Sequence, residues 1–173
     1  MIELPKDKFI LDACCGGRMM WVNKQHPNAV YMDIRIAEPG HDGYSNHSVK
    51  PDIIGDFSKT DFKDKQFKLI VWDPPHIIAS EARIHLTKQY GILKPETWQH
   101  DLKQGFKELW RILDDNGILI FKFNSINVPF DSVLRLFPVE PLFGQTSVQK
   151  KNAETKWFCF MKIPEKEVRK CYH

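Results

Sequence analysis

The chain has 173 residues, of which 42% are hydrophobic and 12% aromatic, which is the size and composition of one globular domain. Its 25 Lys and Arg residues against 22 Asp and Glu residues give a formal charge of +3, too small an excess to identify or exclude nucleic acid as a partner. No stretch reaches the roughly 18 uninterrupted apolar residues of a membrane span, and the first nine residues are unlike a signal peptide. We therefore expect one soluble, cytoplasmic domain over residues 1–173, with no membrane partner.

The cysteine and histidine patterns predict no metal site and no disulfide framework. The four cysteines are unevenly spaced, two of them are neighbours in sequence, and none forms a CxxC pair. No two histidines stand four residues apart with a carboxylate partner, which is the helical spacing of common zinc sites. Reduced thiols in a cytosol are the expectation.

In chain order, the first apolar run covers residues 9–14 and predicts a buried strand that ends in a glycine turn at Gly16 and Gly17. Residues 18–26 follow as a short predicted helix, and residues 29–33 as a second strand. This strand-helix-strand order is the beginning of a parallel sheet.

A long segment without periodicity, residues 36–51, separates this unit from the next strands and is a candidate lid. Two strands are predicted after it, at residues 52–56 and 67–73. The second must stop at Pro74 and Pro75, because proline cannot continue a central strand.

The second half continues the alternation. Apolar residues at every fourth position predict a helix or helical lid over residues 77–93, and a stronger apolar stripe predicts a helix that opens at Pro95 and closes at residues 114–117. The remaining runs predict a strand, a short helix and two strands, at residues 118–123, 130–137, 139–143 and 157–161. The pattern predicts an α/β fold, a Rossmann-like and mostly parallel sheet with helices on both faces.

Successive strands of this sheet end in residues that suit a nucleoside. In an open parallel sheet, ligands bind at the carboxyl ends of the strands near the switch point. Asp33 ends the second strand 21 residues after Asp12, close to the spacing at which an acidic side chain reaches ribose hydroxyls. Asp56 and Phe57 end the third strand and suit an adenine. The carboxylate can accept a hydrogen bond from the amino group of the base, and the phenyl ring can cover the face of the base.

The glycine turn distinguishes between nucleoside cofactors. It contains neither the GxGxxG fingerprint of dinucleotide sites nor the GxxxxGK motif of phosphate loops. An acidic residue just before the turn suits a cationic amino-acid moiety better than a phosphate. We therefore expect S-adenosylmethionine, held in part by Asp12, Ala13, Cys14, Gly16 and Gly17.

The four residues from Asp73 to His76 are the most specific motif. At the end of an apolar strand, the Asp73 carboxylate and the Pro74 carbonyl are neighbouring acceptors that can hold both protons of an exocyclic amine. This would aim the nitrogen lone pair at an electrophilic methyl group, with His76 stacking on the modified ring. We predict Asp73, Pro74, Pro75 and His76 as the catalytic residues.

Taken in order, these residues resemble the class I S-adenosylmethionine-dependent methyltransferases, over roughly residues 8 to 162. The motif at residues 73–76 is similar to the Asp/Asn/Ser-Pro-Pro-Tyr/Phe/Trp motif of the nucleic-acid amino-methyltransferases, and the Cys-Cys-Gly turn resembles small phage and prophage methyltransferases. The resemblance implies a three-layer sandwich around a seven-stranded sheet with an antiparallel last strand. It also implies that the turn holds the methionine part of the cofactor, Asp33 the ribose, Asp56 and Phe57 the adenine, and residues 73–76 the acceptor.

The acceptor remains open at this point. Adenine or cytosine in nucleic acid, single-stranded or flipped out, is the preferred substrate, but His76 stands where the family has an aromatic residue, which admits a small molecule or a protein amine. The chain leaves no room for a separate target-recognition domain, so specificity would come from the loops at residues 36–50, 77–95 and 144–156, or from a protein partner. A cofactor-binding subunit that needs such a partner is a further alternative.

The end of the chain is basic. From residue 145 onward there are seven Lys and Arg residues against three Glu residues. This segment is either an edge that contacts phosphates or a solvated loop and tail.

Overall fold

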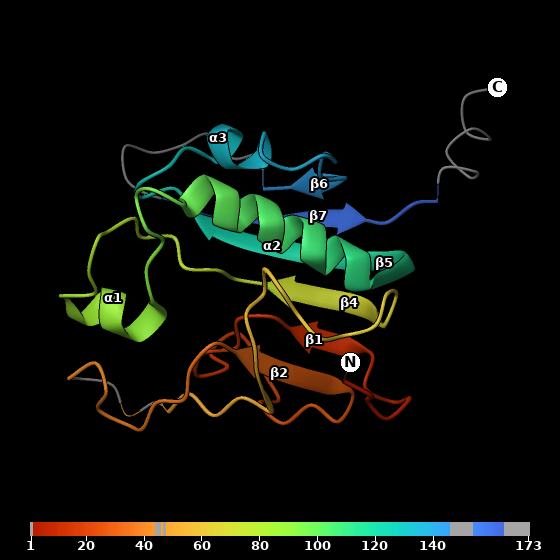
Figure 1. Ribbon diagram of the computed structural model, residues 1–173, viewed down its shortest axis with the longest axis horizontal. Coiled ribbons are helices and arrows are strands. Elements are labelled where there is room, and N and C mark those ends of the chain that lie inside the picture. The colour runs from red at the N-terminus through yellow and green to blue at the C-terminus, as the bar shows by residue number, and fades with distance from the viewer. Residues whose placement is uncertain (1, 44–45, 47, 146–153, 165–173) are drawn as a thin grey trace.

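The computed structural model describes residues 2–43, 46, 48–145 and 154–164 (Figure 1). Within these residues, seven strands form one sheet in the order β3-β2-β1-β4-β5-β7-β6. They are β1 (Ile10–Asp12), β2 (Ala29–Asp33), β3 (Ile53–Ile54), β4 (Phe67–Trp72), β5 (Leu113–Asn124), β6 (Phe143–Gly144) and β7 (Thr155–Met161).

The strand directions confirm the predicted sheet. The strands from β3 to β5 pair in parallel, whereas β7 pairs antiparallel with both β5 and β6. Among the described strands, β7 alone therefore runs against the other six. The carboxyl ends of β1 to β4 share one edge, and the strand order reverses between β1 and β4, which is where ligands bind in open α/β sheets.

Three helices are present in the described part of the chain: α1 (His85–Tyr90), α2 (Trp98–Ile112) and α3 (Phe130–Leu134). Helix α2 lies across the sheet, and α1 lies beyond the carboxyl ends of the parallel strands (Figure 1). The buried stripe of α2 includes Phe106, whose ring stacks on Phe137 with the ring centres 4.4 Å apart. The helix comes close to the sheet at Gly105, where a Cβ atom would lie 2.5 Å from the ring of Phe57.

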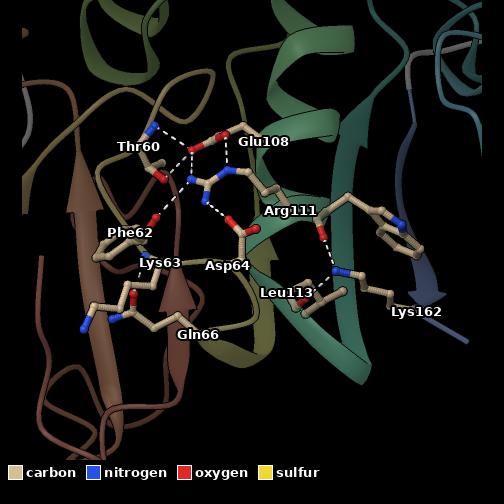
Figure 2. A network of polar contacts seen from close by, with 10 residues as sticks. Thr60, Phe62, Lys63, Asp64, Gln66, Glu108, Arg111, Leu113 and Lys162 are labelled. Carbon is tan, nitrogen blue, oxygen red and sulfur yellow. Dashed lines mark hydrogen bonds and ion pairs between the residues drawn. The ribbon is translucent and has the colours of Figure 1, made fainter. Parts of the chain in front are cut away.

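A polar network fastens the segment between β3 and β4 to α2 (Figure 2). Arg111 of α2 donates to the carboxylates of Glu108 and Asp64 and to the carbonyl of Phe62. Glu108 in turn accepts from the backbone N–H and the hydroxyl of Thr60, at 2.9 and 2.6 Å. The network holds the irregular chain at residues 60–64 against α2. Because this chain follows β3 closely, the carboxyl end of β3 is held in place as well.

The predicted helix at residues 18–26 is wrong: this segment forms turns. Arg18 has a left-handed φ of 55°, and its guanidinium group donates to the carbonyls of Lys24 and Lys50. Trp21 is fixed by a hydrogen bond to Asp12 and packs edge-on against the ring of Tyr31. These contacts outside the segment override the helical pattern. Helices α2 and α3 pack on one face of the sheet, and turns rather than a helix cover the other face beside β1 and β2.

Other boundaries also differ from the predictions. In residues 77–93 only α1 is helical. The two ends of this segment form backbone hydrogen bonds with each other, in a β-bridge between Ile78 and Leu93, instead of bonding within a helix. Strand β5 begins at Leu113, before the predicted helix end at 114–117, and its pairing with β4 is irregular there. The strand predicted at 139–143 is confined to Phe143–Gly144.

Candidate active site

A cavity of about 780 Å³ lies at the carboxyl edge of the sheet. Its walls come from the glycine turn after β1, the ends of β2, β3 and β4, and the chain on either side of Gly91. This volume is within the range of small-molecule and cofactor sites. The structure brings eleven of the twelve predicted site residues to its wall: Ala13, Cys14, Gly16, Gly17, Asp33, Asp56, Phe57, Asp73, Pro74, Pro75 and His76.

Asp12 is the predicted site residue that does not line the cavity. Its carboxylate is fully buried, where it accepts a hydrogen bond from the indole N–H of Trp21 at 2.7 Å and one from the backbone N–H of Cys14 at 3.3 Å. Burial raises the pKa of Asp12 to about 7, and the negative charges of Asp73 and Asp33 act in the same direction. Asp12 therefore shapes the glycine turn from behind the cavity wall.

Asp33 connects the end of β2 to the glycine turn by hydrogen bonds. Its Oδ2 accepts the backbone N–H of Gly16 at 2.9 Å, and its Oδ1 accepts the backbone N–H of Arg35 at 3.2 Å. Gly16 has a φ of 46°, a conformation that favours glycine. The carboxylate is thus held by fixed backbone donors at the cavity wall.

The end of β3 forms the next part of the wall. Oδ1 of Asp56 accepts the backbone N–H and the hydroxyl of Ser58, both at 2.8 Å. The ring of Phe57 is 5.5 Å from that of Trp72, between centroids, and sits against Gly105 of α2. An apolar ring and a fixed carboxylate therefore lie side by side, which is the arrangement expected for an adenine.

Asp73 forms an ion pair that the sequence reading missed. Nζ of Lys122 donates to Oδ2 of Asp73 at 2.5 Å, and it lies 5.7 Å from the centre of the Trp157 ring. Burial raises the pKa of Asp73, and Lys122 opposes this rise. The signal was present in the sequence as one lysine inside the apolar run of residues 118–123, but only the pairing of Trp72 with Phe121 sets Lys122 across from Asp73.

His76 lies beside this pair. Its ring meets that of Phe123 edge-on, with centroids 6.3 Å apart. Burial lowers the pKa of His76, more than the neighbouring Asp73 raises it. The imidazole is therefore neutral at neutral pH, and can face an aromatic ring without adding charge to the site.

The segment at residues 77–93 lines part of the cavity, and hydrogen bonds hold it at its base and at its helical part. Its base is fixed by the backbone N–H of Ile78, which donates to Asn127 at 2.9 Å. Its helical part is held by the guanidinium group of Arg35, which donates to the carbonyls of Lys88 and Gln89. Because Arg35 also forms an ion pair with Asp33 at 3.7 Å, this segment and the predicted ribose site share one side chain.

His41 is a second cavity residue that the sequence reading did not assign. It belongs to the predicted lid, residues 36–51, of which 44–45 and 47 lie outside the described residues. Its Nδ1 is 3.0 Å from the carbonyl oxygen of Glu38, while its Nε2 is buried and has no hydrogen-bond partner in the described part of the chain. His41 therefore contributes to the cavity wall without a side-chain hydrogen bond from Nε2 in the described part of the chain.

The thiols are unsuited to nucleophilic catalysis. Burial raises the pKa of Cys14 well above its ordinary value and that of Cys15 to about 12, so neither is a thiolate at neutral pH. Across the residues that the structure describes, no group of three or more His, Cys, Asp or Glu side chains is arranged to hold a metal ion, and no helix is long and apolar enough to cross a membrane.

The basic end of the chain divides between described and undescribed residues. Lys156 forms an ion pair with Glu154 at 3.5 Å, and Lys162 donates to the carbonyls of Trp110 and Leu113, where it closes the end of α2. The other five basic residues of this segment lie outside the described residues: Lys150, Lys151, Lys166, Arg169 and Lys170.

Neither the family models nor the curated proteins compared with this sequence match it. Solved structures do match. A TehB-like SAM-dependent methyltransferase from Corynebacterium glutamicum has a TM-score of 0.54 at 16% identity, covering 92% of this chain and 82% of that chain. Geranyl diphosphate methyltransferase in complex with SAM has a TM-score of 0.55 at 11% identity, covering 92% and 80%. The chain therefore has the Rossmann-like fold of these methyltransferases.

Proposed function

We propose that this protein transfers a methyl group from S-adenosylmethionine to an exocyclic amine, in adenine or cytosine of a nucleic acid. One observation carries the proposal. A single cavity joins the wall formed by Gly16, Asp33 and Phe57 to the acceptor motif at residues 73–76. A nucleoside cofactor and an amine acceptor would therefore meet in one cavity.

The charges of the cavity fit this cofactor. Among the described residues, the cavity wall carries four aspartates (Asp33, Asp56, Asp73 and Asp101) against three basic side chains (Arg35, Lys94 and Lys122), an excess of one carboxylate, and Lys122 is paired with Asp73. The nearby guanidinium groups of Arg18 and Arg35 are engaged by Asp52 and Asp33 respectively. Such a cavity favours a ligand with a cationic sulfonium and ammonium group over one with phosphates.

The acceptor motif accounts for the reaction. The bound cofactor supplies an electrophilic methyl group. Asp73 and the carbonyl of Pro74 would each accept one N–H of the amine, which turns the nitrogen lone pair toward that methyl group. A bond forms between nitrogen and the methyl carbon as the carbon–sulfur bond breaks and its electron pair stays on sulfur. The nitrogen then loses one proton, through Asp73 or to water.

A base inside a duplex cannot bring its amine to Asp73, which lies in the cavity wall with a side chain that is 20% exposed. The nucleotide must be single-stranded or flipped out of the helix. Neutral His76 on one side of the motif offers a stacking surface for such a base.

The cofactor is tested by calorimetric titration with S-adenosylmethionine, nicotinamide dinucleotide and ATP. We expect micromolar binding of S-adenosylmethionine only. Labelled methyl transfer is then measured onto single-stranded DNA, duplex DNA and RNA, with a small-molecule and a peptide amine as the alternative acceptors. Absence of cofactor binding would reject the proposal of an independent enzyme.

The role of Asp73 is tested with Asp73→Ala. We expect this variant to bind the cofactor within about threefold of the wild-type affinity, and to lose at least about a hundredfold in the rate of transfer. Asp33→Ala is the matched carboxylate variant on the cofactor side, and should weaken cofactor binding. Turnover retained by Asp73→Ala would contradict the assignment.

A further inference from the structure

Lys122 is the cation nearest to the proposed acceptor site. It is the residue of β5 that lies across from Asp73, one position beyond the pair formed by Trp72 and Phe121. It lines the cavity, donates to Oδ2 of Asp73 at 2.5 Å, and has a side chain that is 27% exposed. An ion pair of this kind between neighbouring strand ends is accessible to a ligand in the cavity.

We infer that Lys122 makes the acceptor site selective for neutral amines over alkylammonium ions, because it occupies one oxygen of Asp73 and sets a positive charge beside it. The inference rests on the proposed function and deepens it, since it selects among the classes of amine that the fold leaves open. Lys122 is thus a specificity-determining residue.

The hydrogen-bond geometry favours a planar amino group. Lys122 engages Oδ2 of Asp73, and within the described residues Oδ1 accepts no hydrogen bond. Under the proposed function, this leaves Oδ1 of Asp73 and the carbonyl of the adjacent Pro74 as the two acceptors for the amine. An aromatic –NH₂ group has two donors and is satisfied by this pair, whereas an ammonium group has three donors and leaves one of them unpaired.

The charges act in the same direction. Asp73 and Lys122 cancel each other, and His76 is kept neutral because burial lowers its pKa. The sulfonium of the proposed cofactor adds a further positive charge next to the acceptor. Asp101 also lines the cavity, where its carboxylate accepts a hydrogen bond from the hydroxyl of Thr97 at 2.7 Å. An alkylammonium ion at Asp73 itself would meet the like charges of Lys122 and the sulfonium against the one carboxylate that Lys122 shares.

The experiment compares two probes on the protein saturated with sinefungin, which keeps a positive charge at the position of the sulfonium. The probes are 9-methyladenine, a neutral planar amine, and n-butylammonium, and their affinities are measured at pH 8 by NMR titration. We expect the wild type to prefer 9-methyladenine by about tenfold or more, and Lys122→Met to bind n-butylammonium about tenfold more tightly than the wild type. Lys122→Arg, which keeps the charge, should restore the preference.

A matched control is Lys68→Met on the neighbouring strand β4. Lys68 lies over the ring of Phe9 at 5.9 Å and is not part of the cavity wall, so its loss should leave both affinities at the wild-type values. A second readout is the pH dependence of 9-methyladenine binding. Without Lys122 the pKa of Asp73 should rise, which shifts the acidic limb of the profile to higher pH, while Lys122→Arg should not shift it.

The outcomes separate this inference from the proposed function. An unchanged preference in Lys122→Met, or equal binding of both probes by the wild type, overturns the inference even where nucleic acid is methylated. A preference that switches as expected supports it even where no nucleic acid is methylated, in which case the proposed function fails alone. Binding of neither probe by any variant rejects an amine site at Asp73, and the inference with it.

Discussion

At the scale of single residues, Asp12 combines a structural role with a cost in stability. Its carboxylate orients Trp21 and the backbone of Cys14, and so sets the course of the glycine turn. The same burial raises its pKa to about 7 from an ordinary value of 3.8. Because the folded chain then holds a proton that the unfolded chain has released, the free energy of unfolding falls as the pH rises through this window.

The variant Asp12→Asn tests this effect. The amide oxygen can still accept one hydrogen bond, and the buried charge is removed. We expect the variant to be more stable than the wild type at pH 8, by an amount on the order of a few kcal/mol, and the difference to shrink toward zero as the pH approaches 4. Urea unfolding at pH 4, 6 and 8 measures it. Parallel pH profiles for the two proteins would mean that Asp12 is not buried as a charge.

The same group of residues shows which parts of the candidate site can be predicted from the sequence. Asp33, Asp56 and Asp73 could be assigned because each follows a recognisable strand, and strand ends of a parallel sheet meet at one edge. Lys122 could not, because its partner depends on which residues of β4 and β5 pair, and a shift by one position would turn it to the other face. The withdrawal of Asp12 from the cavity depends likewise on Trp21, which lies in a segment that the pattern predicted as helical.

At the scale of elements, the segment at residues 77–93 approaches the acceptor motif closely at Gly91. Helix α1 ends at Gly91, which has a φ of 81°, and a Cβ atom there would lie 3.2 Å from Cγ of Pro75. The absence of a side chain at Gly91 thus allows the segment to close onto the acceptor motif. Periodicity alone did not predict this, because apolar residues at every fourth position fit both a helix and a folded-over loop.

Gly91→Ala should therefore affect both stability and the acceptor site. We expect a loss of about 1 to 3 kcal/mol in the free energy of unfolding, because Gly91 has a φ of 81° and a ψ of −176°, a region that is adopted almost only by glycine. In addition we expect a weaker binding of 9-methyladenine, because Pro75 must move. Gly40→Ala is a matched control, since Gly40 has a φ of 82° but a Cβ atom there would have nothing within 4 Å. Equal effects of both variants on 9-methyladenine binding would show that the contact with Pro75 is unimportant.

At the scale of the whole molecule, the sheet determines what the chain can and cannot do. The strands β1, β2, β4 and β5 were predictable because each contains an apolar run bounded by turn residues, whereas the order of the strands in the sheet comes from the structure. The edge strands β3 and β6 have two residues each, and their limits come from pairing rather than from pattern. Under the proposed function, a nucleic acid would be bound by the loops around the cavity at the carboxyl edge of this sheet.

This arrangement limits the number of phosphate contacts, and therefore the salt dependence of nucleic-acid binding. With a formal charge of +3 and several basic side chains already paired, we expect about three phosphate contacts. The affinity for a single-stranded oligonucleotide should then fall on the order of tenfold between 50 and 200 mM salt, whereas a small-molecule acceptor should show almost no dependence.

Lys94, on the cavity wall, is the test residue, and Lys103 on the exposed face of α2 is its control. Lys94→Gln should reduce the slope of log affinity against log salt by about 0.7, and Lys103→Gln should leave it unchanged. A flat salt profile in the wild type would instead favour the small-molecule acceptor, because a substrate without phosphates releases no counterions on binding.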